Sequence, residues 1–248
     1  MTLDFDPLAA DYDRLRPAGQ AWEELSERTL AVLGDFRRLV DVGCGTGRFA
    51  AFAKARRGGR VWGVDPAPEM LRRARARPDA VGIGWKQAGA ERLPFTGGWF
   101  DAAHMHLVVH TLPDRPAALA ETARVLMPGG RFAVATFALE HFERFFLNPY
   151  FPSIATIDGA RFPDPAILTG ELEGAGFRDA AVDRISQSIS AEPHDVLERV
   201  RGRYISTLHL LPQAEYADGL ARLEHDVAAG RGAFAYSLEW ALVSATRG

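Results

Sequence analysis

The sequence has 248 residues, of which 47% are hydrophobic and 25% are charged. These values are typical of a globular protein and exclude a disordered chain, a collagen-like fibre and a disulfide-stapled miniprotein. The formal net charge of −3 lacks the basic excess of proteins that bind nucleic-acid phosphates, so we expect no nucleic-acid partner. The only cysteine, Cys44, excludes an intramolecular disulfide, which is typical of a cytoplasmic protein.

No apolar run reaches the roughly 18 residues that a membrane span requires, and residues 1–6 lack the hydrophobic segment of a signal peptide. We therefore expect neither a membrane span nor secretion. The length alone leaves one domain or two open, because domains average about 150 residues. It also leaves open whether the protein is a monomer or a homodimer.

The first half of the chain alternates short apolar runs with helical segments. After an irregular arm, an amphipathic helix is predicted over residues 21–33. Strands are predicted at 38–42, 60–65, 83–87, 99–106 and 131–137, and helices at 47–57, 68–77 and 113–126. This alternation indicates βαβ units and a mostly parallel sheet with helices on both faces, as in Rossmann-like α/β folds.

The second half has a different composition. Residues 139–163 are rich in aromatic side chains, and a helix is predicted at 165–175. Closing strands are predicted at 177–189 and 233–245, with two helices between them in 193–228. No Pro/Gly/Ser-rich linker separates the halves, so we predict one domain with seven strands. Its parts are an arm and helix (1–37), a core (38–138) and two helical lid insertions (139–163 and 190–230).

The most informative segment follows the first predicted strand. Gly43, Gly45 and Gly47 alternate in a turn that leads into a helix, so the backbone can approach a ligand closely. Asp41, just before this turn, suits a ligand with an ammonium group better than a pyrophosphate. The GxGxG spacing also differs from the GxGxxG of dinucleotide sites, which disfavours a nicotinamide-dependent oxidoreductase. A tight turn without a ligand stays an alternative.

Asp65 ends the second predicted strand. A carboxylate at this place can accept hydrogen bonds from both hydroxyls of a ribose. The alternative is that Asp65 caps the helix that follows Pro66.

These segments together resemble the class I S-adenosylmethionine (SAM)-dependent methyltransferases, in particular those of ubiquinone and menaquinone biosynthesis. The matching motifs are LVDVGCGTGRF (39–49), VDPAPEML (64–71), GAERLPF (89–95), FDAAHMHLVVHTLPD (100–114) and RVLMPGGRFAV (124–134). With the YDRLRP element at 12–17, they cover residues 10–138 in the family's order. The resemblance implies SAM as cofactor, S-adenosylhomocysteine (SAH) as product, and a small-molecule acceptor without a metal ion.

The resemblance also assigns residues to the cofactor. Asp41 and the glycine turn would hold the methionine part of SAM, Asp65 the ribose, and Met70 the adenine. The full set implied for cofactor binding is Tyr12, Arg16, Asp41, Gly43, Cys44, Gly45, Gly47, Asp65, Pro66, Met70, Ala90, Glu91 and His106. Many relatives carry Asp where this chain has Gly89, so an adenine contact is either missing or supplied by Glu91. For Tyr12 and Arg16 the alternative is an exposed surface arm.

His104 and His106 lie two residues apart at the end of the fourth predicted strand, so they share a face. Both are candidate catalytic residues, with His106 favoured. A histidine with an ordinary pKa near 6.5 can act as a general base or orient a hydroxyl. The alternative for each is a structural histidine, and we expect His110 to pack at the start of the next helix.

The aromatic segment at 141–151 is either helix core or a hydrophobic lid over an apolar or aromatic acceptor. We favour the lid, with His141, Phe145, Phe146, Tyr150 and Tyr204 as candidate substrate-binding residues and His209 as a weaker one. The predicted function is methyl transfer to O, N or C of a small apolar or aromatic metabolite. The alternatives are a SAM- or SAH-binding protein without methyl transfer and, less favoured, a nicotinamide-dependent oxidoreductase.

Overall fold

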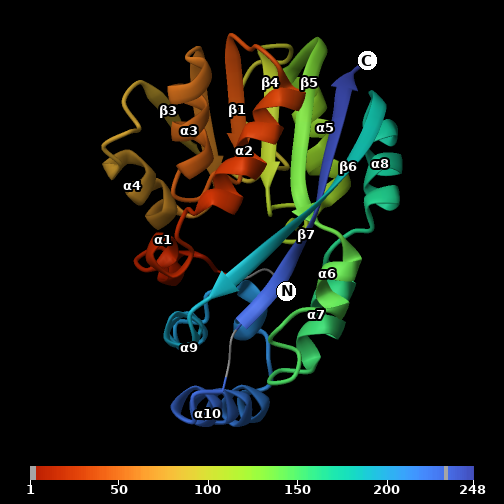
Figure 1. The fold of residues 1–248 in the computed structure, drawn as a ribbon. Coiled ribbons are helices and arrows are strands. Elements are labelled where there is room, and N and C mark those ends of the chain that lie inside the picture. Colours follow the sequence, from red (N-terminus) through yellow and green to blue (C-terminus); the bar gives the residue numbers. More distant parts are fainter. Residues whose placement is uncertain (1–3, 232–233) are drawn as a thin grey trace.

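A computed structural model describes residues 4–231 and 234–248. A seven-stranded sheet forms its centre, with strand order β3-β2-β1-β4-β5-β7-β6 (Figure 1). The strands are β1 (Arg38–Val42), β2 (Arg60–Asp65), β3 (Ile83–Gln87), β4 (Phe100–His106), β5 (Leu126–Phe137), β6 (Phe177–Ala191) and β7 (Phe234–Arg247). The first five strands are parallel, and β7 pairs antiparallel with both β5 and β6. The predicted seven-stranded, mostly parallel α/β fold is thus confirmed.

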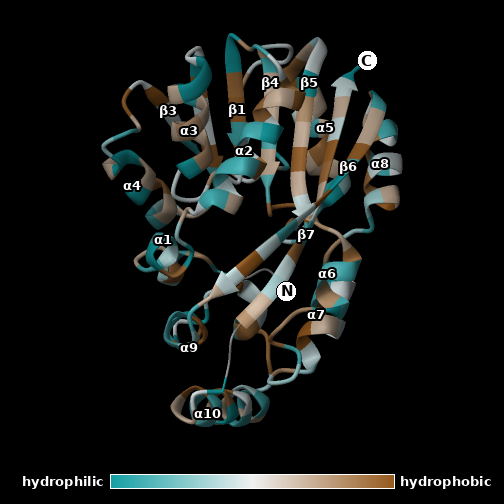
Figure 2. Cartoon of the chain, in the orientation of Figure 1, coloured by the Kyte–Doolittle hydropathy of each residue, from teal (hydrophilic) through white to brown (hydrophobic). Residues whose placement is uncertain are grey.

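Helices cover both faces of the sheet because each carries one apolar face. On one face lie α2 (Gln20–Leu33) and α3 (Arg48–Arg57), whose buried residues form a core with Leu39 and Leu242. On the other face α5 (Arg115–Val125) and α8 (Pro165–Gly174) pack over Val40 and Phe132. Helix α4 (Pro68–Ala76) packs against β2 and β3. Figure 2 shows hydrophobic residues concentrated along the central strands and hydrophilic ones on outer helices such as α4.

Two helices begin where the sequence places a carboxylate before a proline. Asp114 accepts a hydrogen bond from the Ala117 backbone N–H at the start of α5 (3.0 Å). Asp164 accepts one from the Ala166 N–H at the start of α8 (2.7 Å). Such capping satisfies donors that the helix leaves free, and proline at the first turn loses no hydrogen bond.

Several predicted boundaries were wrong. The helix predicted over 113–126 starts at Arg115, after its Asp114 cap, and β5 begins at Leu126 instead of Arg131. The polar arm is not wholly irregular, because it contains the short helices η1 (Asp6–Leu8) and α1 (Tyr12–Leu15). Strands β6 and β7 continue to Ala191 and Arg247, and Ala233, the predicted first residue of the closing strand, lies outside the described residues.

The long β6 and β7 form a two-stranded ribbon that continues past the rest of the sheet (Figure 1). The last pair of β5 with β7 is Phe137–Trp240, whereas β6 stays paired with β7 from Ser186–Glu239 to Ala191–Phe234. At this end lie α6 (Leu139–Glu143), α7 (Ser153–Arg161), α9 (Pro193–Arg201), η2 (Ser206–His209) and α10 (Gln213–Ala228). We call these helices with the ribbon the lower layer.

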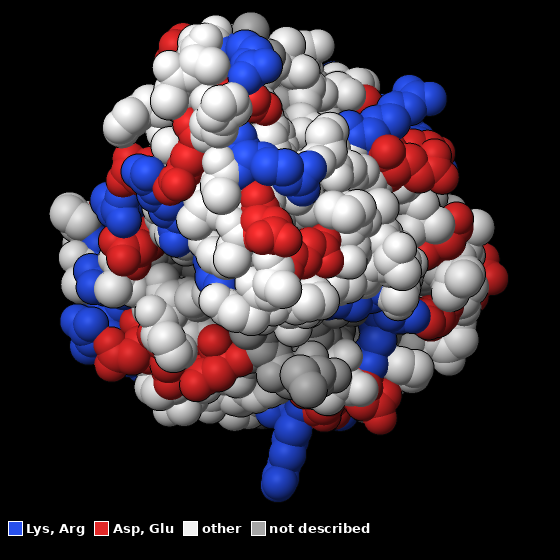
Figure 3. Space-filling view, turned by 90° about the horizontal axis from the view of Figure 1, so that it is seen from below, with Lys and Arg blue, Asp and Glu red and all other residues white. Residues whose placement is uncertain are grey.

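The lower layer has a hydrophobic core of its own. Phe151 and Leu147 from the aromatic segment are fully buried there beside Val200 of α9 and Leu208 of η2. The two segments predicted as insertions, which α8 and most of β6 separate in sequence, therefore pack against one another. Acidic and basic side chains are interleaved over the face of the lower layer that Figure 3 shows. None of the helices in the described part of the chain is long and apolar enough to cross a membrane.

Candidate active site

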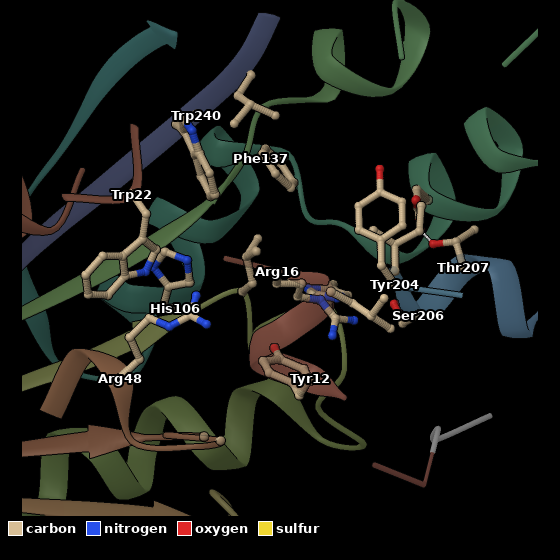
Figure 4. A pocket seen from close by; sticks show the side chains of 18 of the residues that line it. Tyr12, Arg16, Trp22, Arg48, His106, Phe137, Tyr204, Ser206, Thr207 and Trp240 are labelled. Carbon is tan, nitrogen blue, oxygen red and sulfur yellow. Dashed lines mark hydrogen bonds between the residues drawn. The ribbon is translucent and has the colours of Figure 1, made fainter. Parts of the chain in front are cut away.

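A cavity of about 330 Å³ lies between the carboxyl ends of the central strands and the lower layer. This is the edge at which open α/β sheets bind their ligands, and the volume is in the range of small-molecule sites. Its wall combines the glycine turn, the N-terminal arm, and aromatic residues from β5, β7 and the lower layer (Figure 4). It therefore joins the predicted cofactor residues to the predicted substrate segments.

The glycine turn has left-handed backbone conformations at Gly43, Gly45 and Gly47, with φ of 69°, 53° and 76°. A Cβ at Gly47 would lie 2.4 Å from the Trp85 ring, and one at Gly43 would lie 2.4 Å from Val108. Gly45 differs from both, because no heavy atom lies within 4 Å of where its Cβ would be, and it lines the cavity. Gly45 therefore leaves a free cradle on the cavity side of the turn.

Asp65 lies at the end of β2 and holds this turn. Its Oδ2 accepts a hydrogen bond from the Gly45 N–H (2.8 Å), and its Oδ1 accepts one from the Ala67 N–H (2.9 Å). Burial of the carboxylate raises its pKa, and Asp65 is outside the cavity wall. Each oxygen can accept a second hydrogen bond, so the ribose role stays a prediction beside this structural one. Burial also raises the pKa of the neighbouring Cys44 thiol, which keeps it protonated.

His104 does not line the cavity, which corrects its prediction as a catalytic residue. The ring is fully buried and stacks on Phe49 at 3.6 Å between centroids. Its Nδ1 lies 2.8 Å from Oδ1 of Asp41, whose side chain lies at the cavity wall. His104 is therefore placed to orient the Asp41 carboxylate through this hydrogen bond and does not reach the cavity itself.

His106 does line the cavity, between the Trp240 ring (5.6 Å between centroids) and the His104 ring (6.0 Å). Burial, together with the charges of His104 and Arg48, lowers the pKa of His106 to about 3. This pKa lies well below the ordinary histidine value near 6.5 on which a role as general base would depend. A neutral imidazole is a weak base, so the geometry favours the alternative in which His106 orients an acceptor through a hydrogen bond.

The N-terminal arm is held against the glycine turn. Asp13 accepts hydrogen bonds from the Thr46 hydroxyl (2.8 Å), from Arg48 (2.7 Å) and from Arg77 (3.2 Å). Tyr12 and Arg16 line the cavity, and the Arg16 guanidinium lies 4.0 Å from the centroid of the Tyr12 ring. Figure 4 shows Arg16 between the His106 side and the Tyr204 side of the cavity. The arm is thus not the exposed surface segment that was the alternative.

The residues predicted on the adenine side lie outside the cavity wall. Met70 is buried in a small cluster with Ala9 and Ala67. An oxygen of Glu91 lies 2.9 Å from where a Cβ on Gly89 would be. A side chain at position 89 would therefore require the Glu91 carboxylate to move. The adenine roles of Pro66, Met70, Ala90 and Glu91 stay predictions.

Some side chains of the aromatic segment 141–151 line the cavity, as predicted for a lid, and others pack away from it. His141 and Phe145 line the cavity, whereas Phe146 stacks on Tyr236 (4.1 Å) outside its wall. Tyr150 also lies away from the cavity, and its hydroxyl donates to Asp226 (3.1 Å). The predictions of Phe146 and Tyr150 as substrate-binding residues are therefore not supported by their positions.

Residues 193–228 likewise include side chains that line the cavity and side chains that do not. Tyr204 lines the cavity, but His209 does not, because its Nε2 lies 3.0 Å from the Arg203 carbonyl. His110 corrects another expectation, since it lines the cavity and stacks on Phe162 at 3.8 Å between centroids. Burial lowers the pKa of His110 to about 3 and that of His141 to about 4, so both are neutral.

Sequence reasoning missed the contribution of β7. Tyr236, Leu238 and Trp240 alternate along this strand and all line the cavity. Side chains two residues apart share one face of a strand, so this alternation was a usable signal. Other missed wall residues had no such signal: Trp22, Arg48, Phe137, Phe142, Asp158, Phe162, Arg199, Ser206 and Thr207.

Comparison with known proteins identifies the family. Residues 40–134 match the Methyltransferase domain family. Over 199 residues the chain is 31% identical to the 2-phytyl-1,4-naphtoquinone methyltransferase of Thermosynechococcus vestitus, covering 70% of this chain and 88% of that protein. The chain belongs to the class I SAM-dependent methyltransferases. This membership confirms the predicted family and leaves no support for the nicotinamide-dependent alternative.

The similarity to other relatives differs in how much of each chain it covers. An uncharacterized protein of Mycobacterium tuberculosis is 38% identical over 122 residues, and the match covers 47% of this chain and 44% of that protein. The chain thus spans less than half the length of that relative. A solved structure of a putative methyltransferase from an antibiotic biosynthesis pathway of Anabaena variabilis has a TM-score of 0.73 at 21% identity, covering 90% and 97% of the two chains. At that identity the likeness shows the fold alone.

The cofactor of this family is SAM, and the residues present fit its methionine end. The free cradle at Gly45 admits a ligand against the turn. Asp41 supplies a carboxylate for an ammonium group, and Arg16 a guanidinium for a carboxylate. The assignment of individual residues to SAM stays a proposal.

Proposed function

We propose that this methyltransferase transfers the methyl group of SAM to O, N or C of a small aromatic or apolar acceptor. The observation that carries the proposal is the aromatic wall of the cavity, which the glycine turn also lines. Phe137 stacks between Trp240 (4.2 Å between centroids) and His141 (4.0 Å). Phe142 and Phe162 extend the wall, and their ring centroids lie 4.5 Å apart. Such flat apolar surfaces favour an aromatic acceptor.

When bound, SAM supplies a methyl group on a sulfonium, whose thioether is a good leaving group. The chain's own task is then to orient the acceptor in line with that methyl and to exclude water. His106, neutral and at the wall, would donate or accept one hydrogen bond to the acceptor. Because the cavity histidines are weak bases, the proposal favours acceptor atoms that enter with a free lone pair over those that need a strong base.

The test has two readouts on the purified full chain. Calorimetry should show that SAH and SAM bind. Radiolabelled SAM, with a panel of aromatic phenols, amines and carboxylates and their aliphatic polar counterparts, should yield a methylated aromatic product. A panel in which only aliphatic polar compounds are methylated would overturn the aromatic assignment. Tight SAH binding without transfer to any acceptor would favour the alternative of a SAM- or SAH-binding protein.

A further inference from the structure

The charged groups at the cavity wall differ in whether they have a partner. Asp41 lies 2.8 Å from His104, and Asp158 lies 3.2 Å from Arg161 and accepts a hydrogen bond from Thr207 (2.6 Å). Arg48 pairs with Asp13 at 2.7 Å. Asp158 and Arg48 are therefore each paired with an opposite charge. Asp41 is hydrogen-bonded to a histidine instead, and its carboxylate can still accept from the ammonium group proposed for it above.

Two guanidinium groups at the wall have no such partner. Within residues 4–231 and 234–248, no carboxylate lies within 4.0 Å of Arg16 or Arg199. Both line the cavity, and Arg199 is half-buried at the end of α9. A partly desolvated guanidinium without a counter-charge favours an anionic ligand. Arg16 is the guanidinium proposed above for the methionine carboxylate of SAM, which leaves Arg199 unassigned.

Two tyrosine side chains line the same cavity as Arg199. Tyr204 and Tyr236 line the cavity, and among the described residues neither hydroxyl has a hydrogen-bond partner. Burial raises the pKa of both phenols, while the charge of Arg199 acts in the opposite direction on each. Both phenols therefore stay protonated and can donate. One guanidinium and two neutral donors thus line the same cavity as the aromatic wall.

We propose that the acceptor is an aromatic carboxylate whose anionic group is bound by Arg199 with the hydroxyls of Tyr204 and Tyr236. The inference rests on the proposed function for the place of the cofactor. SAM bound beside Arg16 would bring the positive charge of its sulfonium into the cavity, which adds to the attraction for an anion. One guanidinium and two neutral hydroxyls match a single negative charge, so they suit a carboxylate better than a doubly charged phosphate.

The test compares two probes of nearly equal shape, 2-naphthoate and its neutral carboxamide, 2-naphthamide. Their binding to the full chain is measured by calorimetry with and without saturating SAH. We expect the wild-type protein to bind naphthoate about 10-fold or more tightly than naphthamide, since hydrogen bonds to charged groups are the stronger ones. Arg199→Gln should remove this preference by weakening naphthoate alone, and Arg199→Lys should keep part of it.

Arg201→Gln is the matched control, because Arg201 lies on the same helix but pairs with Glu224 (2.7 Å) away from the cavity. It should leave the preference for naphthoate unchanged. Equal binding of the two probes to the wild type would overturn the proposal, as would a preference that survives in Arg199→Gln. Loss of the preference in Arg16→Gln but not in Arg199→Gln would also overturn it. A protein that fails to bind SAH but keeps the naphthoate preference would refute the proposed function and leave the anion site standing.

Discussion

The free cradle at Gly45 allows a prediction in which cofactor binding and stability respond differently. Gly45→Ala places a methyl group where no heavy atom lies within 4 Å, so it creates no clash in the folded protein. The only folding cost is the left-handed backbone at φ 53°, about 1–2 kcal/mol for a residue with a Cβ. For a chain of this size that cost lowers the melting temperature by roughly 2–8 °C.

The cofactor should respond much more strongly. The new methyl group would overlap a ligand seated on the turn, and overpacking of this kind costs about 1–3 kcal/mol, or roughly 5-fold to 150-fold in affinity. Calorimetric titration with SAH measures this loss, and thermal unfolding measures the change in stability.

Two other glycines make the comparison decisive. Gly98→Ala shares the left-handed backbone (φ 66°) and the open surroundings but lies in an exposed loop, so it should lose similar stability and no SAH affinity. Gly47→Ala would bring a Cβ to 2.4 Å from the Trp85 ring, so it should lose the most stability of the three. If Gly45→Ala binds SAH as tightly as Gly98→Ala does, the cofactor does not lie against this turn.

Three further predictions concern single side chains. Asp65→Ala should weaken SAM binding by about 1.5–3 kcal/mol, because the ribose would lose a charged acceptor; unchanged affinity in calorimetry would rule out the ribose role. His106→Ala should lower turnover roughly 10-fold at unchanged SAH affinity, with partial rescue by His106→Gln, whereas wild-type turnover would contradict an orienting role. His141 has a pKa of about 4 in the folded protein, below its ordinary 6.5, so its contribution to stability is complete above about pH 7 and is lost as the pH falls toward 4. Urea unfolding at pH 7.0, 6.0 and 5.5 measures how the free energy of unfolding changes with pH. Below pH 6.5, His141→Gln should reduce this slope by about 1.4 kcal/mol per pH unit relative to the wild type, and an equal slope in the variant would refute the low pKa of His141.

The sheet could be predicted because its signals are local. Each central strand is a short apolar run that ends in a turn, as in Leu39–Val42 before the glycines, and burial on both faces produces such runs. The lengths of β6 and β7 could not be predicted in this way. Their ends pair only with each other, so β6 is exposed along much of its length and its residues lack the apolar pattern of a central strand.

The protonation states of the histidines at the cavity could also not be predicted from the sequence. The histidine pair of β4 was visible, but their different roles depend on which ring is covered. His104 is covered by Phe49 and bonded to Asp41, while His106 faces the cavity beside Trp240. These neighbours come from three different elements, α3, β1 and β7. Burial in the packed structure is the main cause of the low pKa that keeps His106 neutral.

The N-terminal arm shows how one short segment connects the two halves of the site. Asp13 fixes the arm to the glycine turn through Thr46 and Arg48, and the next residue, Arg14, pairs with Glu198 of α9. Leu15 is buried against the turn that follows α9, where a Cβ on Gly202 would lie 2.5 Å from the leucine side chain. The YDRLRP element therefore does more than bring Tyr12 and Arg16 to the cavity wall. It ties the turn that would hold the cofactor to the helix that carries Arg199, so a change in the position of the arm would alter both ends of the cavity together.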